Sequence, residues 1–190
     1  MTDVAARKAA LRTEALARRA TLDEPARKQV ADQLVATIDA LALAPGAVVS
    51  GFVPVRGEID PMPLLEALSA RGHPLALPAV VGPTELVFRR WRPGEALEAA
   101  GFGLRHPPPE AGLVDPDVLL VPLAAFDRRG HRIGYGRGYY DRALARLDAI
   151  GRRRAIGVAF AVQEVPAVPD EPHDRRLDAV LTDEGFRPTA

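Results

Sequence analysis

The chain has 190 residues, 47% of them hydrophobic, which is enough to build the core of one compact domain. Its 25 basic and 25 acidic residues give a formal net charge of zero, which argues against a dedicated binder of nucleic acid or anionic membrane. The lack of cysteine excludes a disulfide framework, a thiolate nucleophile and a cysteine-based zinc site. Because the sequence has neither an apolar run of about 18 residues nor a signal-peptide core, we expect a cytoplasmic protein.

Two helices are predicted at the N-terminus. Residues 3–20 are rich in Ala, Leu and Arg and contain no Gly or Pro, which favours a helix. On this helix Lys8 and Arg12 are four positions apart and project from one face. Such a pair is commonly a solvated basic face, and the functional alternative is a clamp for phosphate. Residues 21–24 (TLDE) match a capping box, and the second helix is expected to continue to about Leu41.

A strand followed by a polar turn comes next. Residues 47–53 (AVVSGFV) predict a buried strand, and Asp60 is the expected N-cap of a helix that has Pro61 at its first position and continues to about Ala70. Glu58 lies just past the carboxyl end of this strand, where ligands bind in open α/β sheets. For a single glutamate in a loop, simple exposure to solvent is the alternative interpretation.

Residues 74–81 and 86–91 predict two more strands, and the alternating pattern of the second suits an edge or antiparallel strand. Trp91 is expected to be a partly buried structural residue. The proline-rich residues 101–116 do not suit a regular element, so we expect an ordered loop or a lid there.

The most informative stretch is residues 117–142, DVLLVPLAAFDRRGHRIGYGRGYYDR. A continuous apolar run at 117–123 predicts a strand buried on both faces, and 126–130 a polar turn. Three glycines then alternate with other residues before a helical pattern begins at the two tyrosines. A glycine loop between a strand and a helix N-terminus favours anion binding, and Arg132 and Arg137 add positive charge. The spacing matches neither the dinucleotide fingerprint nor the P-loop, and a plain tight turn is the alternative.

The C-terminal part contains a predicted buried strand at 154–160 and a proline-rich tail that becomes strand-like before residue 183. Within the tail, His173 and Asp174 suggest a metal or acid–base site, and an aspartate that caps a local turn is the alternative. The alternation of strands and helices predicts a single α/β domain over residues 1–190, with an N-terminal helical segment at 3–42 that packs on the core.

The stretch RIGYGRGYYD at 132–141, preceded by VPLAAFDRRGH, resembles the signature of the 5-formyltetrahydrofolate cyclo-ligases, also called 5,10-methenyltetrahydrofolate synthetases. The helix segment KAALR at 8–12 is similar to the family pattern K-x-x-L-R. Gly57–Ile59 corresponds to a G-E-(I/V) motif, after which the family often has Thr where this chain has Asp60. The tail from Val165 resembles the family's V-P…H-D…L-D-x-V-L-T ending.

This resemblance implies a three-layer α/β/α fold with a mainly parallel sheet, similar to the phosphosugar isomerase and CoA transferase-like fold. It also implies a monomeric enzyme that uses ATP and Mg²⁺ to cyclise 5-formyltetrahydrofolate, with small-molecule substrates and with no nucleic-acid or membrane partner. The implied folate contacts are Glu58 and Tyr140, and the implied metal ligands are Asp141 and Asp174. Lys8, Arg132 and Arg137 are the implied catalytic cations, and the implied ATP contacts are Lys8, Arg12, Arg132, Ile133, Gly134, Tyr135, Gly136, Arg137, Gly138, Tyr139 and Tyr140.

Two alternatives stay open from the sequence. One is a non-catalytic or sugar-phosphate-binding relative on the same fold. The other is a nucleic-acid-binding module built on the arginine-rich first helix, against which the zero net charge argues.

Overall fold

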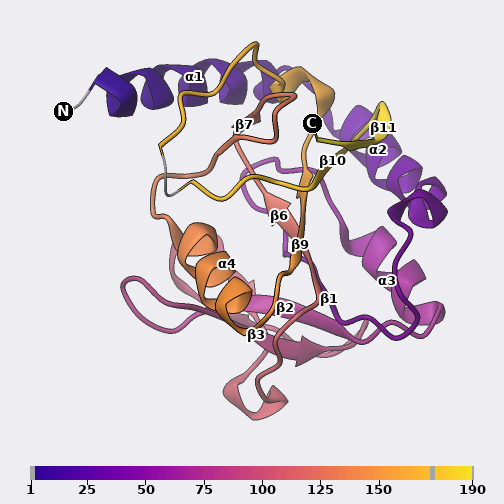
Figure 1. The fold of residues 1–190 in the computed structure, drawn as a ribbon. Coiled ribbons are helices and arrows are strands. Elements are labelled where there is room, and N and C mark those ends of the chain that lie inside the picture. The colour runs from indigo at the N-terminus through magenta and orange to yellow at the C-terminus, as the bar shows by residue number, and fades with distance from the viewer. Residues whose placement is uncertain (1–2, 172–173, 190) are drawn as a thin grey trace.

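A computed structural model describes residues 3–171 and 174–189 of the chain (Figure 1). Its α-helices are α1 (Asp3–Ala20), α2 (Glu24–Ala36), α3 (Met62–Ala70) and α4 (Tyr139–Ile150). Four short 3₁₀ helices are η1 (Ile38–Leu41), η2 (Gly101–Gly103), η3 (Pro109–Ala111) and η4 (Ala161–Gln163). Within the described ranges, no helix is long and apolar enough to cross a membrane.

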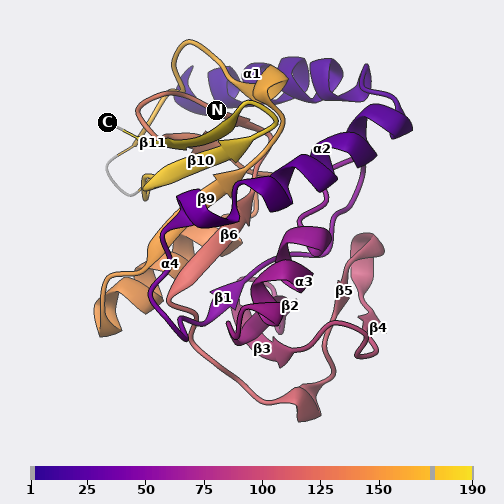
Figure 2. The same ribbon diagram turned by 90° about the vertical axis from the view of Figure 1, so that its right-hand side faces the viewer.

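A seven-stranded sheet with the order β11-β10-β9-β6-β1-β2-β3 forms the centre of the molecule. Its five inner strands are mutually parallel, and β3 and β11 pair antiparallel at the two edges. Two short hairpin-like pairs lie outside this sheet, namely β7 with β8, and β4 with β5, which Figure 2 shows beside the sheet. The strands are β1 (Val49–Ser50), β2 (Leu75–Val80), β3 (Leu86–Trp91), β4 (Glu98–Ala99), β5 (Arg105–His106), β6 (Val118–Pro122), β7 (Ala125–Phe126), β8 (Arg132–Ile133), β9 (Arg154–Val158), β10 (Ala179–Thr182) and β11 (Gly185–Pro188).

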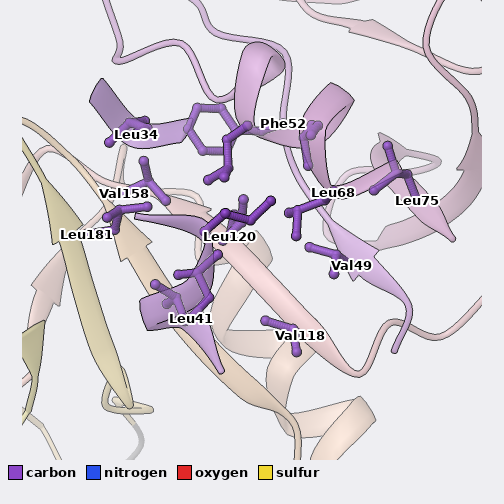
Figure 3. Close-up of a cluster of buried hydrophobic side chains, with 14 of the residues drawn as sticks. Leu34, Leu41, Val49, Phe52, Leu68, Leu75, Val118, Leu120, Val158 and Leu181 are labelled. Atoms are coloured by element: carbon purple, nitrogen blue, oxygen red, sulfur yellow. The ribbon is translucent and has the colours of Figure 1, made fainter. Parts of the chain in front are cut away.

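The alternation of side chains along β6 explains the three layers. Leu120 packs in a buried cluster with Leu34 of α2 and Leu68 of α3, shown in Figure 3. Leu119 packs on the other face with Leu144 of α4. Because successive residues of a strand point to opposite faces, the apolar side chains of β6 pack against helices on both faces of the sheet, as Figure 1 shows. The predicted three-layer α/β/α fold with a mainly parallel sheet is confirmed.

Helix α1 lies at the carboxyl ends of the central strands. It contacts β7, which follows β6, and η4, which follows β9. Ala15 of α1 is fully buried there, in a small apolar cluster with Ala125 and Ile133. This packing places the basic face of α1 beside the loops that leave the sheet.

Several predicted boundaries are wrong for local reasons. Helix α2 is capped by Asp23, whose Oδ1 accepts the Ala26 N–H at 2.9 Å, whereas the Thr21 hydroxyl donates to the Arg18 carbonyl at the end of α1. The same helix ends at Ala36 and not near Leu41, because Thr37 turns its hydroxyl back to the Leu34 carbonyl and a 3₁₀ turn follows.

Helix α3 begins at Met62, one residue later than predicted, although the Asp60 carboxylate still accepts the Met62 N–H at 2.9 Å. The strand predicted at 47–53 is reduced to β1, because the chain leaves the sheet after Gly51. The predicted polar turn at 126–130 starts at the last residue of β7 and connects β7 to β8. Residues 101–116, predicted to lack regular elements, contain β5 and the short 3₁₀ helices η2 and η3. Strand β10 lies in the strand-like end of the tail, as predicted, whereas its antiparallel partner β11 is absent from the prediction.

Trp91 is buried in the core, with 4% of its surface exposed, which confirms its structural role. Strand β3 is an antiparallel edge strand, as its alternation indicates.

Candidate active site

The sheet has a switch in connection direction between β1 and β6. From β1 the chain continues to β2 on one side, whereas β6 is followed by β9 and β10 on the other side. In open parallel sheets, the crevice outside the carboxyl ends of two such strands is the usual ligand site. The glycine loop and Glu58 both follow strands that end at this edge.

A cavity of about 780 Å³ opens at this switch point. Its walls come from the segments that follow β1 and β6, from β2, and from the glycine loop with the start of α4. The segment around β4 and β5, visible beside the sheet in Figure 2, forms part of the remaining wall. Of the predicted site residues, those that line the cavity are Glu58, Arg132, Gly134, Tyr135, Arg137, Gly138, Tyr139, Tyr140 and Asp141.

The glycine loop connects β8 to α4. Gly136 has a φ of +87° and Gly138, the N-cap of α4, has a φ of +63°, a region that residues with a side chain adopt at a cost. The Arg12 Nε donates to the Gly134 carbonyl at 2.8 Å, so α1 holds the loop from outside the cavity. The loop therefore presents backbone and a helix N-terminus to the cavity, which favours an anionic group there.

Arg132 lines the cavity beside the glycine loop. Its guanidinium is ion-paired with Asp141 at 2.5 Å and donates to the Arg175 carbonyl, and only 5% of its side chain is exposed. Burial lowers the pKa of Arg132, and the charges of Asp141 and Asp174 oppose that effect. The two predicted metal ligands therefore both act on the same guanidinium.

Lys8 and Asp174 lie behind the loop and not in the lining of the cavity. The Lys8 Nζ is 2.6 Å from Asp174 Oδ2 and 3.2 Å from Glu171 Oε2, in an ion pair that joins α1 to the C-terminal loop. Burial lowers the pKa of Lys8, but hydrogen bonds with these two carboxylates raise it overall. His173, next to Asp174, lies outside the described residues.

Glu58 is a buried carboxyl in the wall of the cavity, with 9% of its surface exposed. Its Oε2 accepts the Val55 N–H at 2.9 Å, across the turn that follows β1. Burial raises the pKa of Glu58, and interactions with Tyr135 and the Val55 N–H oppose this only in part. The alternative of a solvent-exposed loop glutamate is therefore wrong.

The three tyrosines of the glycine motif differ in their surroundings. The Tyr140 hydroxyl is buried and, within the part of the chain that the structure describes, has no hydrogen-bond partner. The Tyr135 hydroxyl accepts a hydrogen bond from Arg19 at 2.9 Å. The Tyr139 ring lies under the Arg142 guanidinium, 5.6 Å from the ring centroid. Tyr140 therefore adds to the cavity wall a buried hydroxyl that the described residues leave without a partner.

The remaining predicted site residues do not line the cavity, namely Lys8, Arg12, Ile133, Gly136 and Asp174. The Ile133 side chain packs in the core with Ala15 and Ala125, and the Ile133 carbonyl accepts the Ala124 N–H. Among residues 3–171 and 174–189, no group of three or more acidic, histidine or cysteine side chains is positioned to hold a metal ion.

Sequence reasoning missed part of the cavity wall. Residues 100–106 contribute Ala100, Gly101, Leu104, Arg105 and His106, so the predicted loop or lid is a wall of the cavity. It also missed Arg19, which is buried in α1 and contacts the glycine loop through Tyr135. The available signal was an arginine seven positions after Arg12 and four after Ala15, a helical spacing that places the three on one face of α1.

Comparisons of the sequence with known proteins all lead to one enzyme family. A sequence model of the 5-formyltetrahydrofolate cyclo-ligase family matches residues 4–183. The 5-formyltetrahydrofolate cyclo-ligase of Mycolicibacterium smegmatis is 36% identical over 184 residues, which cover 92% of this chain and 93% of that protein. The Escherichia coli K12 enzyme of the same name is 34% identical over 140 residues, or 70% of this chain and 76% of that protein.

The solved structures give the same result. The NMR structure of Aquifex aeolicus 5,10-methenyltetrahydrofolate synthetase superposes with a TM-score of 0.80 at 30% identity, covering 95% of this chain and 92% of that one. A Mycoplasma pneumoniae 5,10-methenyltetrahydrofolate synthetase shares the fold, with a TM-score of 0.74 at 24% identity. The superposition covers 93% of this chain and 98% of that one. The chain therefore belongs to the 5-formyltetrahydrofolate cyclo-ligase family.

Proposed function

We propose that the protein closes 5-formyltetrahydrofolate to 5,10-methenyltetrahydrofolate at the expense of ATP, with release of ADP and phosphate. The observation that carries the proposal is one cavity that joins an apolar wall, suited to a flat ring, to a glycine loop and a buried arginine, suited to phosphate. A transferred phosphoryl group and the acceptor that receives it must lie side by side, and this cavity offers both surfaces.

The chemistry explains why these parts are needed. A formamide oxygen is a poor leaving group, so N10 of the folate does not displace it directly. Transfer of the γ-phosphoryl group to the formyl oxygen gives an iminophosphate and ADP. N10 then attacks the formyl carbon and loses its proton to solvent, and the C–O bond breaks so that phosphate leaves as the ring closes. No covalent enzyme intermediate is required, which agrees with a chain that contains no cysteine.

Positive charge near the phosphates is the main requirement of such a transfer. Arg132 and Arg137 line the cavity beside the loop and would stabilise charge on the transferred group. Arg12 would act by holding the Gly134 carbonyl, so that the loop amides stay positioned. Lys8 would exchange its two carboxylate partners for a phosphate oxygen when nucleotide binds.

Recognition of the folate is assigned to Glu58 and Tyr140. A pterin carries adjacent N–H donors on one edge, and a buried carboxylate that accepts both is a strong and specific partner. The Tyr140 hydroxyl, buried without a partner in the described structure, would gain a hydrogen bond from the substrate.

The residues present fit a magnesium ion that arrives with the nucleotide. Mg²⁺ is usually held by one or two carboxylates together with phosphates and waters, and Asp141 and Asp174 both act on the Arg132 guanidinium. Asp141 and Asp174 would hold the ion, which would neutralise phosphate charge when bound.

The direct test follows the absorbance of the methenyl product after the protein is mixed with 5-formyltetrahydrofolate, ATP and Mg²⁺. We expect product formation that requires the nucleotide, with one ADP and one phosphate formed for each folate. A protein that only binds sugar phosphates would give no absorbance change, and folate closure without ADP formation would contradict the ATP-dependent mechanism.

A further inference from the structure

A second, smaller cavity lies beside the first and is rich in arginine. Its volume is about 260 Å³, and it is lined by Leu16, Arg19, Ala20, Arg27, Arg56 and Tyr135. The three arginines come from α1, from α2 and from the turn after β1, so three separate segments direct cations to one place. Arg56 and Tyr135 also line the large cavity, and the two cavities are therefore neighbours.

None of these three arginines forms an ion pair with a carboxylate of the described residues. Arg19 is buried, with 4% of its surface exposed, and donates only to neutral oxygens, the Tyr135 hydroxyl and the Arg56 carbonyl, both at 2.9 Å. Arg27 donates to the Arg19 carbonyl at a long 3.4 Å. Buried charges are normally paired, so Arg19 is a buried guanidinium without an ion-pair partner, and the half-buried Arg27 and the exposed Arg56 add two more cations to the same cavity.

The Arg27 Nε strengthens this observation. It is buried and has no hydrogen-bond partner among the atoms that the structure describes. A buried donor that is left unsatisfied destabilises the folded protein, and more so when the group is charged. A ligand that accepts from the guanidinium would remove this cost.

The turn after β1 is shaped around Arg27. Arg56 has a φ of +52° and Gly57 a φ of +76°, and the Glu58 N–H donates to the Val55 carbonyl at 3.0 Å, which makes a tight turn with two left-handed residues. A Cβ at Gly57 would lie 2.6 Å from the Arg27 Nη1. The left-handed conformation is costly for arginine and brings its side chain to the cavity, a pattern that is concentrated at ligand sites.

One acidic group acts on the cluster without balancing it. Glu58 interacts electrostatically with Arg19 and Arg56, and a single carboxylate does not offset three guanidinium groups. The cluster therefore keeps an excess of positive charge beside the large cavity.

We propose that Arg19, Arg27 and Arg56 bind an oxyanion, a carboxylate or a phosphate group, at a site separate from the glycine loop. The forked donors of arginine match the oxygens of both groups. Such an anion has two sources. One is a carboxylate of the glutamate tail of the folate, an assignment that rests on the proposed function. The other is a free anion, such as the inorganic phosphate that the reaction releases.

The first experiment needs no catalytic activity. The melting temperature of the parent protein and of the variants Arg27→Gln, Arg56→Gln and Lys28→Gln is measured against sodium phosphate at constant ionic strength. Lys28 is the matched control, because it is an exposed cation next to Arg27 on α2. All four proteins keep the glycine loop, so any phosphate bound there contributes equally. We expect phosphate to raise the melting temperature of the parent and of Lys28→Gln by the same amount. In both arginine variants we expect this rise to be at most half as large.

The second experiment identifies the source. It compares KM for 5-formyltetrahydrofolate with one glutamate, for the form with three, and for 5-formyltetrahydropteroate, which has none. A rise of about tenfold in Arg27→Gln for the glutamate-bearing substrates alone identifies the tail, since one charged hydrogen bond contributes about that much. If Arg27→Gln loses the phosphate response but keeps the parent's KM for all three substrates, the ligand is a free anion.

The proposal is overturned if all four proteins respond alike to phosphate and the KM values show no dependence on glutamate. A rise in KM that is the same for all three substrates, with the phosphate response intact, also overturns it, because it indicates that Arg27 only supports the fold. If the protein closes no folate at all, the proposed function fails while the phosphate measurement still decides the anion site.

Discussion

The Lys8 ammonium and the Asp174 carboxylate form an ion pair with 2.6 Å between Nζ and Oδ2, across 166 positions of sequence. Glu171 adds a second carboxylate at 3.2 Å. In the proposed reaction Lys8 would bind a phosphate oxygen and Asp174 a metal ion, and until nucleotide binds the two side chains neutralise each other. When a polyphosphate binds with its cation, the phosphate would replace Asp174 as the anion beside Lys8, and the cation would replace Lys8 beside Asp174.

Removal of this ammonium is the first test of the phosphate clamp. We expect Lys8→Ala to raise KM for ATP about tenfold, the effect of losing one charge-assisted hydrogen bond. The free energy of unfolding should fall by only about 1 kcal/mol, as is usual for a partly exposed ion pair. Steady-state kinetics and chemical denaturation measure the two effects.

Lys28→Ala is the control, because Lys28 is the only other lysine and is exposed on α2. An unchanged KM for ATP in Lys8→Ala, or an equal change in both variants, would remove Lys8 from the site.

The glycine loop is tested by a pair of matched substitutions. Gly136 and Gly72 have φ values of +87° and +88°, and a Cβ on either would meet no atom closer than 3.6 Å. Gly136→Ala and Gly72→Ala should therefore lose similar stability, about 1–2 kcal/mol, from backbone strain alone. Only Gly136→Ala should also weaken nucleotide binding, measured by calorimetric titration with ADP. Equal nucleotide affinity in the two variants would indicate that the loop is a plain turn.

Glu58 is expected to bind the folate and not the phosphates. Glu58→Gln keeps an oxygen that accepts the Val55 N–H but loses the charge that would pair with the pterin edge. We therefore expect KM for 5-formyltetrahydrofolate to rise tenfold or more while KM for ATP changes less than twofold. An equal rise for both substrates would assign Glu58 a structural role.

The same substitution gives a pH-dependent change in stability. The pKa of Glu58 in the folded protein lies above its usual value of 4.5, because burial disfavours the charged form. Between these two values the unfolded chain has lost the proton and the folded protein keeps it, so the free energy of unfolding falls as pH rises above 4.5. We expect this fall to be smaller in Glu58→Gln, measured by denaturant titrations from pH 4 to pH 8. Parallel pH profiles would show that Glu58 titrates normally.

Local patterns were sufficient to predict most of the regular elements. The Ala- and Leu-rich residues 3–20 form α1 with the predicted bounds, and the apolar runs at 117–123 and 154–160 contain β6 and β9. Local patterns failed where side chains compete for backbone groups. Asp23 rather than Thr21 caps α2, because the Thr21 hydroxyl already bonds the Arg18 carbonyl.

The site was only partly predictable, because some contacts join distant segments. The glycine loop and Glu58 follow strands that end at one edge, and topology brings them to one cavity. No local pattern indicates that Lys8 meets Asp174 or that Arg19 meets Tyr135. The arginine cluster depends on the positive φ of Arg56, which a sequence with arginine at that position does not suggest.

The last prediction concerns the metal. Asp141 lies in the first turn of α4, lines the cavity, and pairs with Arg132, and 38% of its side chain is exposed. It could act as a magnesium ligand or as a partner that holds Arg132 in place. As a ligand, Asp141→Asn should bind ATP and keep its fold but lose at least 90% of turnover, with partial recovery at high Mg²⁺. Asp174→Asn should show the same dependence, although Asp174 also bonds Lys8.

As a partner of Arg132 alone, Asp141→Asn would lower stability and turnover by amounts that added Mg²⁺ does not change, because no metal affinity has been lost. The measurement is turnover against Mg²⁺ concentration for the parent, the two variants and Asp32→Asn, which removes an exposed carboxylate of α2. The ligand role requires a half-saturating Mg²⁺ concentration at least tenfold higher in Asp141→Asn and Asp174→Asn than in the parent and Asp32→Asn. Four equal half-saturation values would assign Asp141 to Arg132, and the cation would then have to be held by the nucleotide phosphates alone.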